Sequence, residues 1–129
     1  MHDPQVSFQV RINDSASLEE MGARVEQALQ CQFSPSTSNF FSGDPALESF
    51  CLGLWITLSC QMQLAENSDL TNYVLMGTLR GDLEANWEDN YSIISISQYV
   101  LAVIKRLDNE TWYIPDSEEL YLEAGFIPE

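Results

Sequence analysis

The stretch FCLGLWITLSC, residues 50–60, decides the fold prediction. Large apolar residues occupy every second position of it, namely Phe50, Leu52, Leu54, Ile56 and Leu58. A period of two places successive side chains on opposite faces of a strand. We therefore predict one central strand over 50–60, with this face buried against helices and Gly53 at a bulge or opposite a close neighbour. Trp55 falls on the other face, either covered by a loop or exposed as a docking platform.

The segments around this stretch alternate between strand and helix patterns. Residues 6–12 and 72–79 show strand patterns, and the second is expected to pair antiparallel with the central strand. Apolar residues recur at helical spacing over 17–30, where Ser17 and Glu20 form a capping box. This order of patterns predicts a sheet that carries helices.

A second helix is predicted over 96–107, with Ser95 or Ser97 as its N-cap and an apolar stripe that includes Tyr99 and Leu107. Asp116 and Glu119 could cap a short last helix that Gly125 ends. The chain is short enough for one domain, 1–129. The predicted fold class is α+β, an antiparallel β-sheet packed on one face by two to three α-helices.

The charge of the chain departs most from that of an average protein. Twenty Asp and Glu against five Lys and Arg give a net charge of −15 over 129 residues. Direct binding to nucleic acid or to an anionic membrane is not expected, because both ligands attract basic surfaces. A protein partner with a cationic surface is expected instead, in a 1:1 complex.

Motifs for catalysis and cofactor binding are missing from the sequence. It has no nucleophile elbow, phosphate-binding loop, dinucleotide fingerprint or zinc-protease motif, and its one histidine is His2. A Ser or Cys nucleophile would lack its usual base. Paired carboxylates such as Asp82 with Glu84, or Glu88 with Asp89, would suit only glycosidase-type acid chemistry. We predict no enzymatic activity, no cofactor and no metal.

Cysteine usage and the N-terminus indicate the compartment. Cys31, Cys51 and Cys60 are odd in number and lack the C-x-x-C spacing of redox and zinc sites. On one strand, Cys51 and Cys60 would point to opposite faces and could not pair. We expect three reduced, mostly buried thiols. The N-terminus has no signal-peptide pattern, and no apolar stretch is long enough to span a membrane, so we expect a cytoplasmic protein.

Acidic and aromatic residues are interleaved in two segments without an intervening basic residue, 82–91 and 108–121. Aromatic side chains supply contact area at interfaces, and carboxylates steer a cationic partner. The alternative for Trp112 and Tyr113 is a place in the core beside solvated acids. The predicted partner-binding residues are Asp82, Glu84, Trp87, Glu88, Asp89, Tyr91, Trp112, Tyr113, Asp116, Glu118 and Glu119.

Three stretches have a family resemblance: LGLWITL (52–58), SISQYVLAVI (95–104) and WYIPDSEELYLEAG (112–125). With the small size, the acidity and the α+β pattern, they resemble the immunity proteins of bacterial toxin systems, including contact-dependent growth inhibition. The resemblance implies a cytoplasmic protein that binds one cognate toxin domain and blocks it. It implies no role for any individual residue.

Two functions from different classes remain open. The first is an immunity protein that covers the cationic cleft of a toxin domain, for which we favour a nuclease, since carboxylates can imitate a phosphate backbone. The second is an acidic adaptor or chaperone-like interaction domain that is acidic only for solubility. An adaptor of the second kind needs an exposed apolar groove, and the sequence pattern indicates none.

Overall fold

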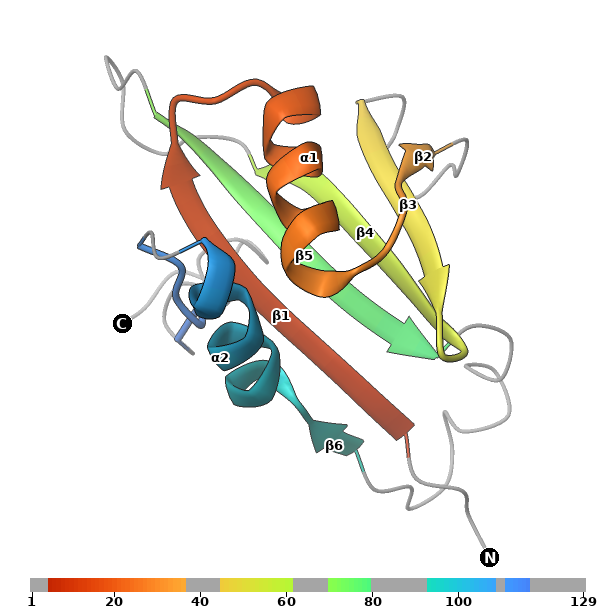
Figure 1. Cartoon of the computed structure of the whole chain (residues 1–129). Helices are drawn as coiled ribbons and strands as arrows, with labels where there is room; N and C mark the ends of the chain where they lie inside the picture. The colour runs from red at the N-terminus through yellow and green to blue at the C-terminus, as the bar shows by residue number, and fades with distance from the viewer. Residues whose placement is uncertain (1–4, 37–44, 62–69, 80–92, 109–110, 117–129) are drawn as a thin grey trace, which may run out of the picture.

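A computed structural model describes residues 5–36, 45–61, 70–79, 93–108 and 111–116. Within these ranges one β-sheet carries two helices on one face (Figure 1). The elements in chain order are β1 Gln5–Asp14, α1 Leu18–Leu29, β2 Ser34–Pro35, β3 Ala46–Cys51, β4 Leu54–Gln61, β5 Thr71–Leu79, β6 Ile93–Ser95 and α2 Ser97–Leu107. The predicted α+β class is confirmed.

The sheet has six strands in the order β2-β3-β4-β5-β1-β6. Neighbouring strands are antiparallel, except that β6 runs parallel to β1. The predicted antiparallel pairing of 72–79 with the strand before it is confirmed, because β5 pairs with β4 along its whole length. In the described part of the chain, neither helix is long and apolar enough to cross a membrane.

Helix α1 begins as its sequence predicts. The Ser17 hydroxyl accepts a hydrogen bond from the Glu20 N–H at 3.2 Å, and the Glu20 carboxylate accepts one from the Ser17 N–H at 3.1 Å. This reciprocal pair satisfies two N–H groups that lack a partner inside the helix. The helix ends at Gln30, which adopts the left-handed conformation with φ 60°.

Helix α2 differs from its prediction at the N-cap. Ile96 is the N-cap residue, and no side chain caps the helix there. The Ser97 hydroxyl instead accepts a hydrogen bond from the Gln9 N–H of β1 at 3.0 Å, which ties the first turn to the sheet. Tyr99 and Leu107, expected in the apolar stripe, are exposed.

The prediction of one strand over 50–60 is wrong. Leu52 and Gly53, with φ values of 53° and 80°, turn the chain between β3 and β4. Positive φ at both central residues is typical of a type I′ turn, the turn of a tight β-hairpin. Cys51 then pairs with Leu54, and paired residues share a face of the sheet. Phe50 therefore lies on the face opposite Leu54 and is 56% exposed.

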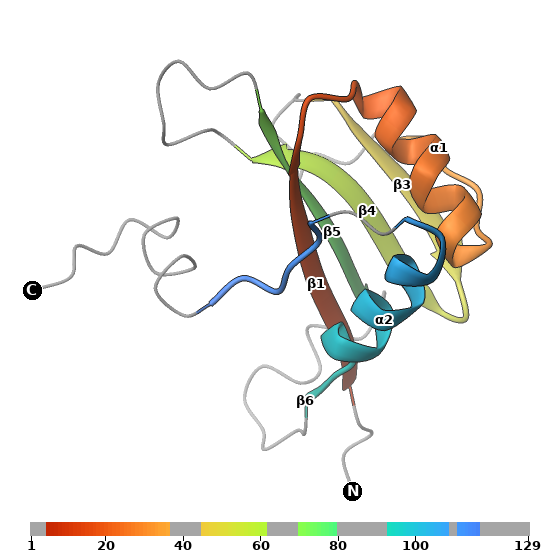
Figure 2. The ribbon, with the colours of Figure 1, turned by 60° about the vertical axis from the view of Figure 1, so that its left-hand side comes forward.

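The core lies between the sheet and the two helices, which stand on the same side of it (Figure 2). Its buried side chains come from alternate positions of β1, β4 and β5, from one stripe of each helix and from the segment 111–116: Phe8, Val10, Ile12, Met21, Val25, Ala28, Ile56, Leu58, Tyr73, Leu75, Val100, Ile104 and Trp112. Ile56 and Leu58 are buried as predicted, and Leu54 is half-buried against them. Gly77 leaves room for the ring of Phe8 on the neighbouring strand.

Candidate functional site

Most of the predicted partner-binding residues lie outside the described residues. These are Asp82, Glu84, Trp87, Glu88, Asp89, Tyr91, Glu118 and Glu119. The predicted short last helix and its Glu119 cap lie outside them too. Only Trp112, Tyr113 and Asp116 can be placed in the fold.

Trp112 belongs to the core, so its place in the predicted surface is corrected. Its side chain is 2% exposed, and its indole N–H donates to Asp108 Oδ2 at 2.7 Å. A tryptophan that is buried and hydrogen-bonded in this way stabilises the fold and offers a partner no contact area. The alternative that the sequence left open for Trp112 is therefore the observed one.

Asp108 also forms an ion pair with Arg24, the basic residue in the middle of α1. Arg24 Nε and Nη2 donate to the two Asp108 oxygens at 3.1 and 2.9 Å, and Nη1 donates to Asp14 Oδ2 at 3.0 Å. The hydrogen bonds to Asp108 contribute most to raising the pKa of Arg24. Burial raises the pKa of Asp14, but hydrogen bonds from the Ala16 N–H and from Arg24 outweigh burial and lower it. This cluster joins α1, α2 and the end of β1.

Tyr113 lies at the edge of the sheet beside β1. Its backbone N–H and C=O exchange two hydrogen bonds with Arg11, each of 2.8 Å, and its hydroxyl accepts one from Asn72 at 3.0 Å. The side chain is half-buried, whereas Asp116 is exposed. Asp116 is thus on the surface, whereas the contacts of Tyr113 mainly hold its segment against β1.

Negative charge is unevenly distributed along the chain. The described residues hold seven Asp and Glu and four Lys and Arg, which gives −3 of the total −15. Of the four basic residues, Arg11 is buried and Arg24 is held by Asp14 and Asp108, while Lys105 and Arg106 are exposed on α2. The other −12 belongs to residues outside the described ranges, among them the predicted segment 82–91.

The tip of the β3–β4 hairpin is a surface feature that the sequence interpretation missed. Leu52 is 95% exposed and Phe50 is 56% exposed. Phe50 pairs across the hairpin with half-buried Trp55, whose indole N–H donates to Glu48 Oε1 at 3.2 Å. We call Phe50, Leu52 and Trp55 the hairpin tip. Its signal was Gly53 inside the alternation, which marks a turn as well as a bulge.

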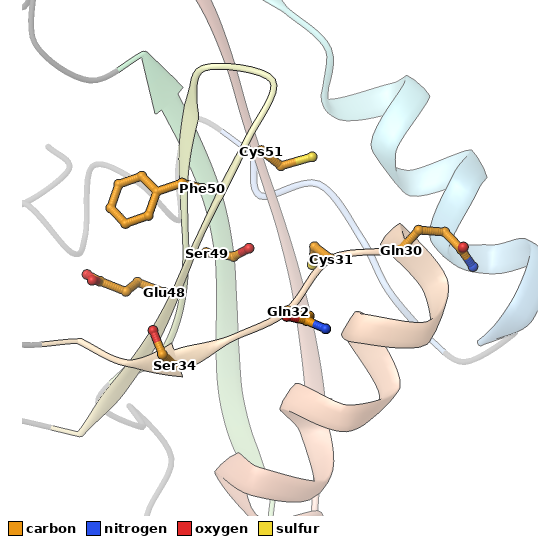
Figure 3. Close-up of a pocket in the computed structure, with 8 residues that line it drawn as sticks. All are labelled: Gln30, Cys31, Gln32, Ser34, Glu48, Ser49, Phe50 and Cys51. Carbon is orange, nitrogen blue, oxygen red and sulfur yellow. The ribbon is translucent and has the colours of Figure 1, made fainter.

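A hollow of about 490 Å³ lies beside the hairpin tip, between the end of α1 and β3 (Figure 3). It is lined by Gln30, Cys31, Gln32, Ser34, Glu48, Ser49, Phe50 and Cys51. Cys31 and Cys51 are half-buried thiols outside any disulfide, whereas the Cys60 thiol is exposed, so the expectation of mostly buried thiols fails for Cys60. No three His, Cys, Asp or Glu of the described ranges are grouped as a metal site would require.

Comparison of the chain with protein-family models, with curated proteins and with solved structures finds no match.

Proposed function

We propose that this protein is an immunity protein, which binds the cationic cleft of a bacterial toxin domain and blocks it. The toxin that fits best is a nuclease, because a nuclease cleft is built to hold a phosphate backbone and a carboxylate surface can imitate one. The proposal also places the protein in the cytoplasm, free of enzymatic activity, where an incoming nuclease would act.

The observation that carries this proposal is the net charge of −15. A field of this size steers a cationic protein toward the molecule and raises association rates by roughly ten- to a thousand-fold at low salt. The described residues contribute only −3, so most of the steering charge belongs to residues outside the described ranges. In the described part, Lys105 and Arg106 are the exposed basic side chains, both near the end of α2.

Steering by charge is not specific, so a tight complex also needs apolar anchors. Trp112 is buried and cannot serve as one. We propose Leu52 as an anchor in place of Trp112, because its backbone conformation is unusual for a leucine. Both central positions of a type I′ turn favour Asn, Asp or Gly, yet a leucine stands at the first with φ 53° and 95% of its surface exposed.

A leucine at such a position contributes neither to the turn nor to the core. Residues that violate local preferences without a structural gain tend to occur at functional sites. We therefore assign the hairpin tip as one apolar anchor for the toxin domain. Trp87 of the acidic segment 82–91 is the second proposed anchor. Exposed Asp116 stays in the proposed acidic surface.

Affinity capture from the source organism, followed by measured association kinetics, tests this proposal. We expect a stoichiometric partner with a basic surface whose association rate falls steeply between low and physiological salt. The double charge reversal Glu88→Lys with Asp89→Lys should slow association and flatten its salt dependence. An acidic or neutral partner, or rates indifferent to salt and to this variant, would favour the adaptor alternative.

A further inference from the structure

Two cysteines face one hollow from segments that are twenty positions apart in sequence. Cys31 follows the end of α1, and Cys51 is the last residue of β3 (Figure 3). Both thiols are free and partly accessible. The third cysteine, Cys60 of β4, does not line this hollow. The two thiols therefore share an environment that the third does not.

Ser49 lies in the same hollow as the two thiols. Its side chain lines the hollow and is near enough to Cys31 to lower the pKa of that thiol by hydrogen bonding, although burial raises the pKa more. Ser49 and Cys51 are alternate residues of β3 and share one face of the sheet. Cys51 follows Ser49 by two residues, about 6.6 Å along the strand. Figure 3 shows the side chains of Ser49 and Cys51 on the side of β3 that faces Cys31. A disulfide between the two cysteines requires their Cα atoms to lie about 4.4–6.8 Å apart.

We propose that Cys31 and Cys51 form a reversible thiol–disulfide pair, whose oxidant is a small disulfide of the glutathione type. One cysteine thiolate attacks a sulfur of the oxidant, forms a mixed disulfide and releases one thiolate. The second cysteine attacks the protein sulfur of that mixed disulfide and releases the second. The two protons of the cysteines pass to the leaving thiolates, so the protein loses two hydrogens and the oxidant becomes two thiols.

The proposed bond would link the end of α1 to β3 and close the hollow between them. Burial raises the pKa of the Cys31 thiol, which keeps this cysteine protonated near neutral pH and makes closure faster as pH rises. This inference does not depend on the proposed toxin partner, because it concerns two residues of the described fold alone.

Oxidised glutathione added to the Cys60→Ser variant tests the pair without interference from the third thiol. Cleavage after glutamate separates the two cysteines, because Glu48 lies between Cys31 and Cys51. We expect the intact protein to lose two hydrogens and the digest to contain a linked pair of peptides, 27–48 with 49–66. The control variants Cys31→Ser/Cys60→Ser and Cys51→Ser/Cys60→Ser should each gain a single glutathione and form no link.

The unfolding equilibrium supplies a second readout. A bond that closes a loop of this length should lower the unfolding constant of the Cys60→Ser variant on the order of a hundred-fold, measured by urea denaturation with and without reductant. Glutathione adducts without a link, a link only between two molecules, or an oxidised form no more stable than the reduced form would each overturn the proposal.

Discussion

Arg24 and Asp108 face each other across the contact between α1 and the end of α2, with two donor–acceptor pairs at 3.1 and 2.9 Å. The same carboxylate accepts the indole N–H of Trp112, and the same guanidinium reaches Asp14. Side chains from four segments thus meet at one charged cluster that is partly buried. Bidentate arginine–carboxylate pairs of this kind fix geometry as well as contribute energy.

Replacement of Arg24 by Met should lower the free energy of unfolding by about 1–3 kcal/mol. The variant keeps the apolar part of the side chain but leaves two carboxylates without their shared donor. Urea denaturation followed by tryptophan fluorescence measures the loss. The matched control is Arg106→Met on the exposed surface of α2, which should cost less than about 0.5 kcal/mol. Equal losses in the two variants would contradict a structural role for the cluster.

Asp14 should make the stability of the protein depend on pH in the acid range. Its folded pKa lies below the usual 3.8, so the ionised form stabilises the fold above that value. This contribution is lost as pH falls through the folded pKa. The free energy of unfolding should therefore be larger for wild type than for Asp14→Asn at pH 6. The difference should shrink as the pH falls below about 4. Glu19→Gln, which replaces an exposed carboxyl of α1, is the control. A convergence of equal size between the Glu19→Gln and wild-type curves would contradict the assignment to Asp14.

Gly77 should tolerate no side chain. A Cβ at this position would overlap the ring of Phe8, which is buried. Gly77→Ala is expected to cost about 1–3 kcal/mol of unfolding free energy. Phe8→Leu should recover part of this loss, so the double variant should be more stable than the sum of the single losses predicts. Simple additivity in thermal or urea denaturation would contradict the predicted overlap.

Leu52→Asn should have opposite effects on stability and on binding. Asparagine accepts positive φ in a type I′ turn more readily than leucine, so the variant should gain about 0.5–1 kcal/mol of stability. Loss of the exposed leucine should weaken the complex with the captured partner at least about five-fold, mainly through faster dissociation. Calorimetry and surface-based kinetics measure the two effects. Unchanged affinity would remove the hairpin tip from the proposed interface.

Much of the fold followed from local patterns. The capping box at Ser17 and the strand alternation of 6–12 and 72–79 predicted α1, β1 and β5, because each depends on neighbours in sequence. The β3–β4 hairpin was missed for a physical reason. The turn is two residues long, so apolar residues still occupy every second position of the sequence across it. Leu52 at its first central position is also not a residue type that favours turns.

The candidate surface was less predictable than the fold. The position of Trp112 depends on Asp108 and Arg24, and Arg24 is far from it in sequence. Exposure of Leu52 likewise depends on where the turn falls. Charge steering is different, because it depends on net charge alone and can be stated from composition.

A titration of the captured nuclease with this protein measures the proposed inhibition itself. Residual nuclease activity is measured at fixed enzyme concentration while the protein is added across equivalence, in wild-type form and as the Glu88→Lys/Asp89→Lys variant. For wild type we expect nuclease activity to fall linearly to its floor at a 1:1 ratio, whereas the variant should need a large excess. Full nuclease activity in a saturated complex would show that the protein does not block its partner.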